Sequence, residues 1–182
     1  MMNDELFREA VFDALCACLN LDRDSAEAAA LIHEAYAEPE NAPRPPRHRN
    51  VIYWTVLQDP SPDPVAVTYG PEHGAGRNTN VVYTTLKYQL IIVCYGPASG
   101  EYALRIRSML YLDGYGFPRQ ILRAAGIYPV PDPPQPALLH EEEGSLWRKR
   151  ADLTIRLRIR DEQRSQEAGM ISSAPPVILH NS

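Results

Sequence analysis

The sequence predicts an α+β fold: a single domain with a mainly antiparallel β-sheet packed by helices, and with extended proline-rich loops or arms. Three observations support this prediction. Two long stretches of alternating polarity, at 81–94 and 147–160, predict strands, and amphipathic helical patterns lie before and between them. The 17 prolines gather in clusters between these elements, which indicates loops or arms rather than a second core. Helices and strands that are segregated along the chain favour the α+β class.

Three segments are expected along the chain. Residues 1–49 are predicted to hold N-terminal helices and a basic proline-rich connector, and residues 50–160 an α+β core domain. Residues 161–182 form a C-terminal extension, in which the apolar residues 177–179 could add one strand to another element. A chain of 182 residues is long enough for one domain with a substantial core.

Two helices are predicted at the N-terminus. Between residues 3 and 19 the apolar side chains fall on one stripe, which is typical of an amphipathic helix. Asp24 and Glu27 have the spacing of a capping box, so we expect a second helix over 25–38 that ends before Pro39. The arginines and prolines that follow predict an extended connector.

The strand at 81–94 is expected to organise the domain. One of its faces is apolar throughout, while the other becomes apolar only near its end, which predicts that its second half is covered on both faces. A strand of this length should either bend or project beyond its own domain. Gly96 and Pro97 then predict a corner, and a helix with Ser99 as its N-cap should lie back on the sheet.

Shorter elements are expected in the remainder of the core domain. The predicted set is a strand over 51–57, a short strand over 65–69, a polar loop over 70–80, a helix over 118–125 stopped by Gly126, an extended segment over 127–136 and a charged turn over 141–144.

Composition and charge limit the partners and the environment that we expect for this protein. The formal net charge of −5 gives no global attraction to nucleic acid, although local patches can differ from the mean. No apolar run approaches the length of a membrane span, so we expect no membrane association. Three cysteines without a repeating spacing are expected to be reduced thiols.

We expect no catalytic site, no cofactor and no metal. The glycine-rich loop at 70–76 precedes a strand rather than the helix that a phosphate site needs. Cys16 and Cys18 would point in different directions on a helix, and the five histidines are scattered without ligand spacing. Cys94 falls on the apolar face of its strand, where a cysteine is an inert hydrophobe.

The strand at 147–160 carries the most pronounced polar pattern. It should pair antiparallel with the strand at 81–94, with Trp147 and the apolar residues that alternate with it facing inward. The candidate interface or DNA-channel residues are Arg148, Arg150, Arg156, Arg158, Arg160, Glu141, Glu142 and Glu143. The arginines could meet DNA phosphates or an acidic protein surface, or they could form a solvated face balanced by cross-strand carboxylates. The glutamates could pair with basic patches across a ring interface.

Several of these segments together resemble a known family. The run YQLIIVCYGPASGEYALRIRSML at 88–110, the GIYPV at 126–130 and the EEEGSLWRKRADLTIRL at 141–157 are similar to those of bacteriophage neck and tail-terminator proteins, which act in tail completion and head–tail joining. The positions that carry the resemblance are Cys94, Tyr95, Gly96, Ala98, Ala103, Pro129, Pro131, Pro133, Trp147 and Arg150.

The resemblance implies a structural virion protein of a tailed phage rather than an enzyme. Such a protein would form a homo-oligomeric ring, commonly a hexamer, that terminates the tail tube and joins it to the neck or head connector. The implied partners are further copies of the chain, the tail tube protein, the connector proteins and DNA in the channel. Its implied place is the neck or tail of the virion, after assembly in the host cytoplasm.

Two alternatives remain at this point. Another tail or baseplate component differs from a terminator in its partners rather than in its physics. A small phage-encoded hydrolase would need a pocket with convergent polar groups around Cys94 or His140.

Overall fold

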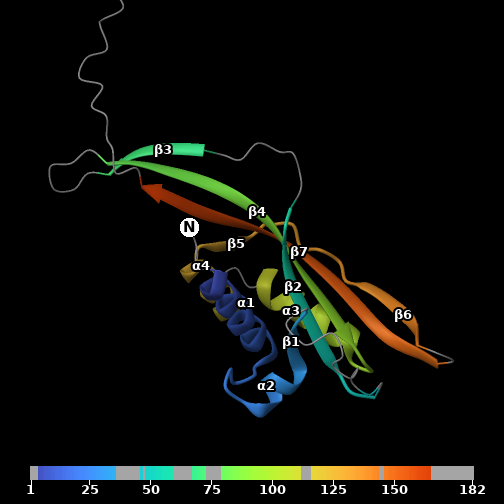
Figure 1. The fold of residues 1–182 in the computed structure, drawn as a ribbon. Coiled ribbons are helices and arrows are strands. Elements are labelled where there is room, and N and C mark those ends of the chain that lie inside the picture. The colour runs from blue at the N-terminus through green and yellow to red at the C-terminus, as the bar shows by residue number, and fades with distance from the viewer. Residues whose placement is uncertain are drawn as a thin grey trace, which may run out of the picture.

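The computed structural model describes residues 4–35, 46, 48–59, 67–72, 79–111, 116–143 and 146–164, and the side chains of 5–35, 46, 48–59, 85–111, 116–142 and 146–159. These residues form an α+β fold in which helices pack on a mostly antiparallel sheet, as predicted (Figure 1). The elements in chain order are α1 (Asp4–Leu19), α2 (Ala26–Leu31), β1 (Ile32–Glu34), β2 (Val51–Gln58), β3 (Val67–Glu72), β4 (Thr79–Tyr95), α3 (Ser99–Tyr111), α4 (Phe117–Ala124), β5 (Ile127–Pro129), β6 (Ala137–Glu143) and β7 (Leu146–Arg164).

The sheet is built around the antiparallel pair β4 and β7. Within the described residues it has seven strands, in the order β1-β2-β4-β7-β5, while β3 pairs with β4 and β6 pairs with β7. Register runs without interruption from Val81 opposite Arg164 to Tyr95 opposite Arg150. All neighbouring strands are antiparallel except β1, which is parallel to β2. The predicted pairing of the two long strands is confirmed.

The β4–β7 ribbon extends beyond the helices at both ends (Figure 1). At one end β3 pairs with the first half of β4, and at the other β6 pairs with the first half of β7. The strand at 81–94 was expected either to bend or to project beyond its domain, and the structure shows that it projects. Ile91 and Val93, on the face away from the helices, are half-buried, so the second half of β4 is not enclosed equally on its two faces.

One face of the sheet carries the helices and the core. Alternate residues of β4 and β7, such as Ile92 and Leu153, are buried beneath α1, α3 and α4 (Figure 1). Phe7, Val11 and Leu15 bring α1 into the same cluster, so the N-terminal helix shares one core with the sheet. Burial of these apolar side chains is the main favourable term in folding. Among the described residues, no helix is long and apolar enough to cross a lipid bilayer.

The corner between β4 and α3 depends on Gly96. Its φ of 105° lies in a region that side-chain-bearing residues rarely adopt, and a Cβ there would lie 2.6 Å from Oδ1 of Asn50. That same oxygen accepts a hydrogen bond from the Ala98 amide at 3.0 Å, which satisfies a donor at the helix start. The helix begins at Ser99 itself, so the cap lies one residue earlier than predicted.

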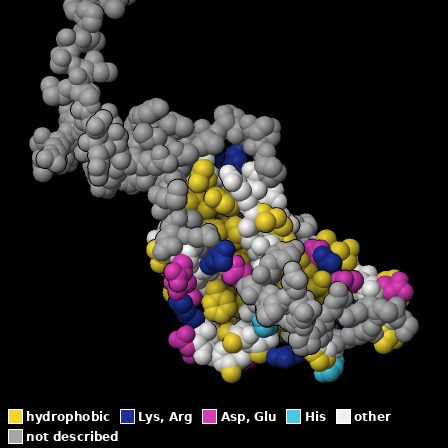
Figure 2. Space-filling view, in the orientation of Figure 1, with side chains coloured by type: hydrophobic (Ala, Val, Ile, Leu, Met, Phe, Trp, Pro, Cys, Tyr) yellow, Lys and Arg dark blue, Asp and Glu magenta, His cyan; other side chains and the backbone are white. Residues whose placement is uncertain are grey.

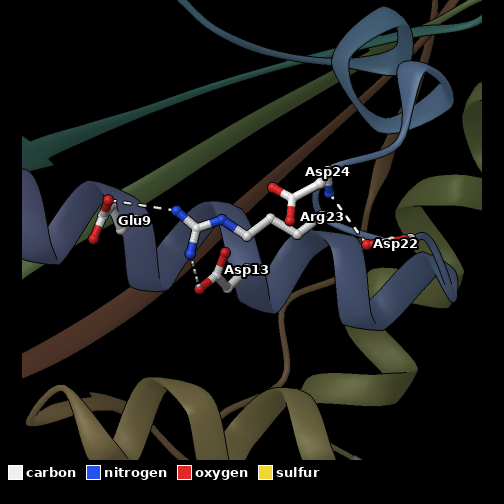
Figure 3. Close-up of polar contacts among 5 residues, drawn as sticks. All are labelled: Glu9, Asp13, Asp22, Arg23 and Asp24. Atoms are coloured by element: carbon white, nitrogen blue, oxygen red, sulfur yellow. Dashed lines mark hydrogen bonds and ion pairs between the residues drawn. The ribbon is translucent and has the colours of Figure 1, made fainter.

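An ion-pair cluster fixes the connection between α1 and α2. Arg23 reaches back along α1, and its guanidinium lies 3.1 Å from Asp13 and 3.4 Å from Glu9 (Figure 3). The Asp24 amide donates to the Asp22 carboxylate at 3.2 Å in the same turn. Arg23 and Glu9 are about half exposed and Asp13 is partly exposed, so each pair contributes little to stability and mainly orients the turn.

Two elements were predicted with the wrong type of secondary structure. The second helix was predicted over 25–38, but α2 ends at Leu31 and the chain continues as β1, which pairs with β2. Its N-cap is Ser25, whose hydroxyl accepts from the Ala28 amide. The charged turn predicted at 141–144 is instead the end of β6, because the acidic residues extend a ladder with β7.

Other expected elements agree in type. The strand predicted over 51–57 is β2, and the helix predicted over 118–125 is α4, followed by Gly126 with a φ of 74°. Part of the loop predicted over 70–80 belongs to β3 and β4. Most of the proline-rich connector, residues 73–78 and the tail at 177–179 lie outside the described residues.

Candidate interaction surface

The sheet face opposite the helices, called here the outer face, carries a polar and aromatic cluster at the junction of β4, β6 and β7. Tyr95 and Arg150 are paired in register and lie on this face. The ring of Tyr95 also makes an edge contact with Tyr53 of β2, with 6.2 Å between centroids. Two basic residues of β7, Arg148 and Arg150, also lie against this ring, so Tyr95 is the centre of the cluster.

Arg148, a candidate interface or DNA-channel residue that was predicted to point outward, lies on the outer face but is buried there. Its exposed fraction is 6%, and its guanidinium carbon lies 4.6 Å from the centroid of the Tyr95 ring. A cation stacked on an aromatic face is attracted by the ring quadrupole. Within the described part of the chain, Nε and Nη2 of Arg148 have no hydrogen-bond partner. The strand alternation gives its face correctly but not its exposure.

Arg150 is held by two carboxylates. Its Nε and Nη2 donate to Asp152 at 2.7 and 2.8 Å, and its Nη1 donates to Glu141 at 3.3 Å. The hydrogen bonds to Asp152 are the main reason that the pKa of Arg150 is raised above its ordinary value. Burial raises the pKa of Tyr95 and the hydrogen bond to Glu141 adds to this, while the charge of Arg150 opposes it. The guanidinium of Arg150 is therefore already bound by carboxylates of the same chain.

The other candidate arginines lie further along β7. Arg156 is exposed and forms an ion pair with Asp132, from the segment before β6. Arg158 is exposed and lies opposite Lys87 of β4. The side chain of Arg160 is outside the described set. Of the candidate arginines with described side chains, the exposed ones are thus Arg156 and Arg158 on the distal part of β7, and Asp132 balances the charge of Arg156.

The three glutamates of β6 do not act alike. Glu141 is half-buried and belongs to the Tyr95 cluster. Glu142 is exposed and pairs in register with Trp147, on the helix-bearing face. The side chain of Glu143 is not described. Because neighbouring residues of a strand point to opposite faces, this acidic run divides between the two faces of the sheet.

The β6–β7 hairpin exposes apolar side chains on both of its faces. Trp147 was predicted to face inward, and it does lie on the helix-bearing face, but it is 65% exposed because the hairpin projects past α3. Leu138 is 66% exposed on the same face, and Leu139 and Leu146 are exposed on the other. In Figure 2, hydrophobic and acidic side chains lie together at the lower right end of the molecule, where the hairpin is. Exposed apolar residues gathered in one element indicate an interaction site.

Two hollows flank the start of α3. One, of about 290 Å³, lies between this helix start and the hairpin and is lined by Ser99, Leu138, His140 and Lys149 among others. The other, of about 390 Å³, lies between α3 and α2 and is lined by Leu31, His48, Arg49 and Tyr102 among others. Neither hollow was predicted from the sequence, because each is lined by residues that are distant along the chain and meet only in the fold.

The cysteines lie in the core. Burial raises the pKa of Cys94 to about 12, that of Cys18 to about 12 and that of Cys16 to about 11. A thiol needs its thiolate form to act as a nucleophile, so Cys94 is not poised for the chemistry that the hydrolase alternative requires. Among the described residues, no group of three or more His, Cys, Asp or Glu side chains is placed to hold a metal ion.

A comparison with known protein families shows the class of this protein: it is a structural protein of the phage neck. The family model described as phage neck terminator protein matches residues 6–177, and the chain belongs to this family. The match spans almost all of the described elements and extends beyond the region that carried the sequence resemblance. No curated protein matches the chain.

Proposed function

We propose that this chain forms a homo-oligomeric ring, with six as the expected number of subunits, that terminates the tail tube and joins it to the neck or head connector. The single observation that carries the proposal is the projecting β6–β7 hairpin, with Leu138 and Trp147 largely exposed. A monomer gains nothing from holding a tryptophan in water, whereas an interface gains the burial of its apolar surface. Membership of the neck terminator family supports the same proposal.

The exposed arginines are proposed to face a partner of the ring. Arg156 and Arg158 lie on the outer face, away from the hairpin that is proposed to join subunits. DNA in the channel or an acidic surface of the tail tube or connector would both suit them, because each offers negative groups. Arg148 and Arg150 are assigned a role within the subunit, since one is buried and the other is bound by Asp152 and Glu141.

The mass of the purified protein tests the ring. We expect light scattering at several concentrations to give a closed oligomer, or a monomer that becomes one when isolated tail tubes are added. A protein that stays monomeric at all concentrations and does not bind tubes would contradict the proposal. Replacing both Arg156 and Arg158 by glutamine should then leave the ring mass unchanged while weakening tube, connector or DNA binding.

A further inference from the structure

At the helix-covered end of the sheet, the two lateral edges are β1 and β6. One row of register crosses every strand between them: Ile32 lies opposite Ile52, which lies opposite Cys94, then Ala151 and finally Leu138. Within the described residues, β1 pairs only with β2 and β6 pairs only with β7. Each edge therefore has a row of backbone groups that a further strand can bind.

The directions of these two edges are complementary. Strand β1 is parallel to β2, whereas β2, β4, β7 and β6 alternate in direction, so β6 and β1 run opposite to each other. A rotation about an axis roughly along the strands preserves these directions. Such a rotation places β6 of one copy antiparallel to β1 of the next, so the two strands can form an antiparallel hydrogen-bond ladder.

The charges at the two edges are also complementary. Glu142 is exposed near the end of β6, at the end of the sheet where β2 begins. His48 and Arg49 lie in the short segment before β2 and are exposed. Arg49 lies near the β1 edge, because its Nη2 donates to the Ala30 carbonyl at 3.3 Å. Opposite charges meeting across an interface fix its register and disfavour wrong partners.

We propose that the β6 edge of one subunit adds to the β1 edge of a second copy of this chain, with Glu142 facing Arg49 and with Leu138 and Trp147 covered by the α2 side of the neighbour. The hollow lined by Leu31, His48, Arg49 and Tyr102 lies on that side, next to β1. The two surfaces differ, so the contact is heterologous and can continue around a ring. This inference rests on the ring of the proposed function and names the surfaces that close it.

Charge reversal tests the contact. Glu142→Arg and Arg49→Glu should each lower the assembled fraction at least tenfold, and the double variant should recover most of it. Arg123→Glu is the matched control, since Arg123 is exposed in the last turn of α4, away from both edges, and should leave assembly unchanged. Circular dichroism of each variant separates loss of assembly from loss of folding.

Cysteine cross-linking provides a second, independent measurement. The native cysteines are all buried, so a Glu142→Cys and His48→Cys pair in one chain offers the accessible thiols. Oxidation of the assembled protein should give a ladder of covalent oligomers on a non-reducing gel, whereas either single variant should give dimers at most. Tail tubes are added where the free protein does not assemble.

The outcomes separate this inference from the ring itself. If rings form but charge reversal has no effect and no ladder appears, other surfaces close the ring and the β6–β1 contact is overturned. If no ring forms, with or without tubes, the proposed function fails as well. Rescue by the double variant together with a ladder supports the contact.

Discussion

The guanidinium of Arg148 stacks on the ring of Tyr95, with 4.6 Å between the guanidinium carbon and the ring centroid, while Arg150 approaches the same ring at 5.6 Å. The two arginines share an aromatic neighbour but differ in their polar partners. Arg150 has two carboxylates, and Arg148 has no hydrogen-bond partner for two of its nitrogens among the described residues. This difference predicts that removing the charge of Arg150 costs more stability than removing that of Arg148.

Replacing Arg148 by methionine should change the free energy of unfolding by no more than about 1 kcal/mol, or raise it. The change removes a buried charge whose Nε and Nη2 have no hydrogen-bond partner among the described residues, and this offsets the lost cation–π attraction. Arg150→Met should lower it by about 1–2 kcal/mol, because Asp152 and Glu141 lose their donor. Urea denaturation measures both. A larger loss for Arg148→Met than for Arg150→Met would show that Arg148 has a strong partner.

The two tryptophans of the chain should respond differently to substitution. Trp54 is buried in the core, so Trp54→Ala should cost about 3–5 kcal/mol of stability. Trp147→Ala should leave the stability of the monomer nearly unchanged but weaken assembly, because its ring is exposed in the free subunit. Thermal melts and light scattering check the two effects. In the Trp54→Phe variant, fluorescence from Trp147 should shift to the blue on assembly.

Two glycines with positive φ should differ in their tolerance of a side chain. At Gly96 a Cβ would meet Asn50 Oδ1 at 2.6 Å and the Arg49 carbonyl at 2.7 Å, so Gly96→Ala should cost about 3 kcal/mol or more from strain and a steric clash together. At Gly126 nothing lies within 4 Å of the added carbon. Gly126→Ala should therefore cost only about 1 kcal/mol, the backbone penalty alone. Equal losses in chemical denaturation would contradict this account of the corner.

Stability should fall in alkaline solution. The ordinary thiol pKa is 9.0, and burial raises the pKa of Cys94 to about 12 in the native state. Below pH 9 the Cys94 thiol is protonated in both the native and the unfolded state. Above pH 9 the thiol of the unfolded chain loses its proton while that of the native chain keeps it, so unfolding is favoured as pH rises toward 12. Each such thiol lowers the free energy of unfolding by about 1.4 kcal/mol per pH unit in this window.

The slope of stability against pH between 9 and 11 checks this prediction. Cys94→Ala should make the slope shallower by one thiol, whatever its effect on stability at neutral pH. Burial also raises the pKa of Tyr111 to about 12, which acts in the same direction at the upper end of the range. An unchanged slope in the variant would show that Cys94 ionises at its ordinary pKa when folded.

Sequence reasoning succeeded where a local pattern determined the structure. The alternation in β4 and β7, the corner at Gly96 and the helix that follows were all predictable, because period and turn chemistry are properties of neighbouring residues. The pairing of β4 with β7 followed from the inward faces of two long amphipathic strands. These elements also carry the family resemblance.

The rest depended on contacts between distant segments. Ile32–Glu34 continues a helical pattern in the sequence, and only its pairing with β2 makes it a strand. The acidic end of β6 is a strand because β7 lies beside it. The alternation of the strand placed Arg148 and Trp147 on the correct faces, but it did not predict that Arg148 is buried and Trp147 is exposed. An aromatic ring covers one of them, and the hairpin carries the other past the helices.

The uninterrupted ladder between β4 and β7 has a consequence for how the chain folds. Although β4 and β7 pair directly, the chain between them contains α3, α4, β5 and β6. The centre of the sheet therefore cannot close until this intervening segment has brought the two strands together. Contacts between such distant residues slow folding, whereas the β6–β7 hairpin can form from neighbouring residues. The hairpin can therefore exist, with its apolar side chains exposed, before the rest of the sheet is complete. At high protein concentration, correct folding therefore requires the sheet to close faster than the exposed hairpins of different chains associate.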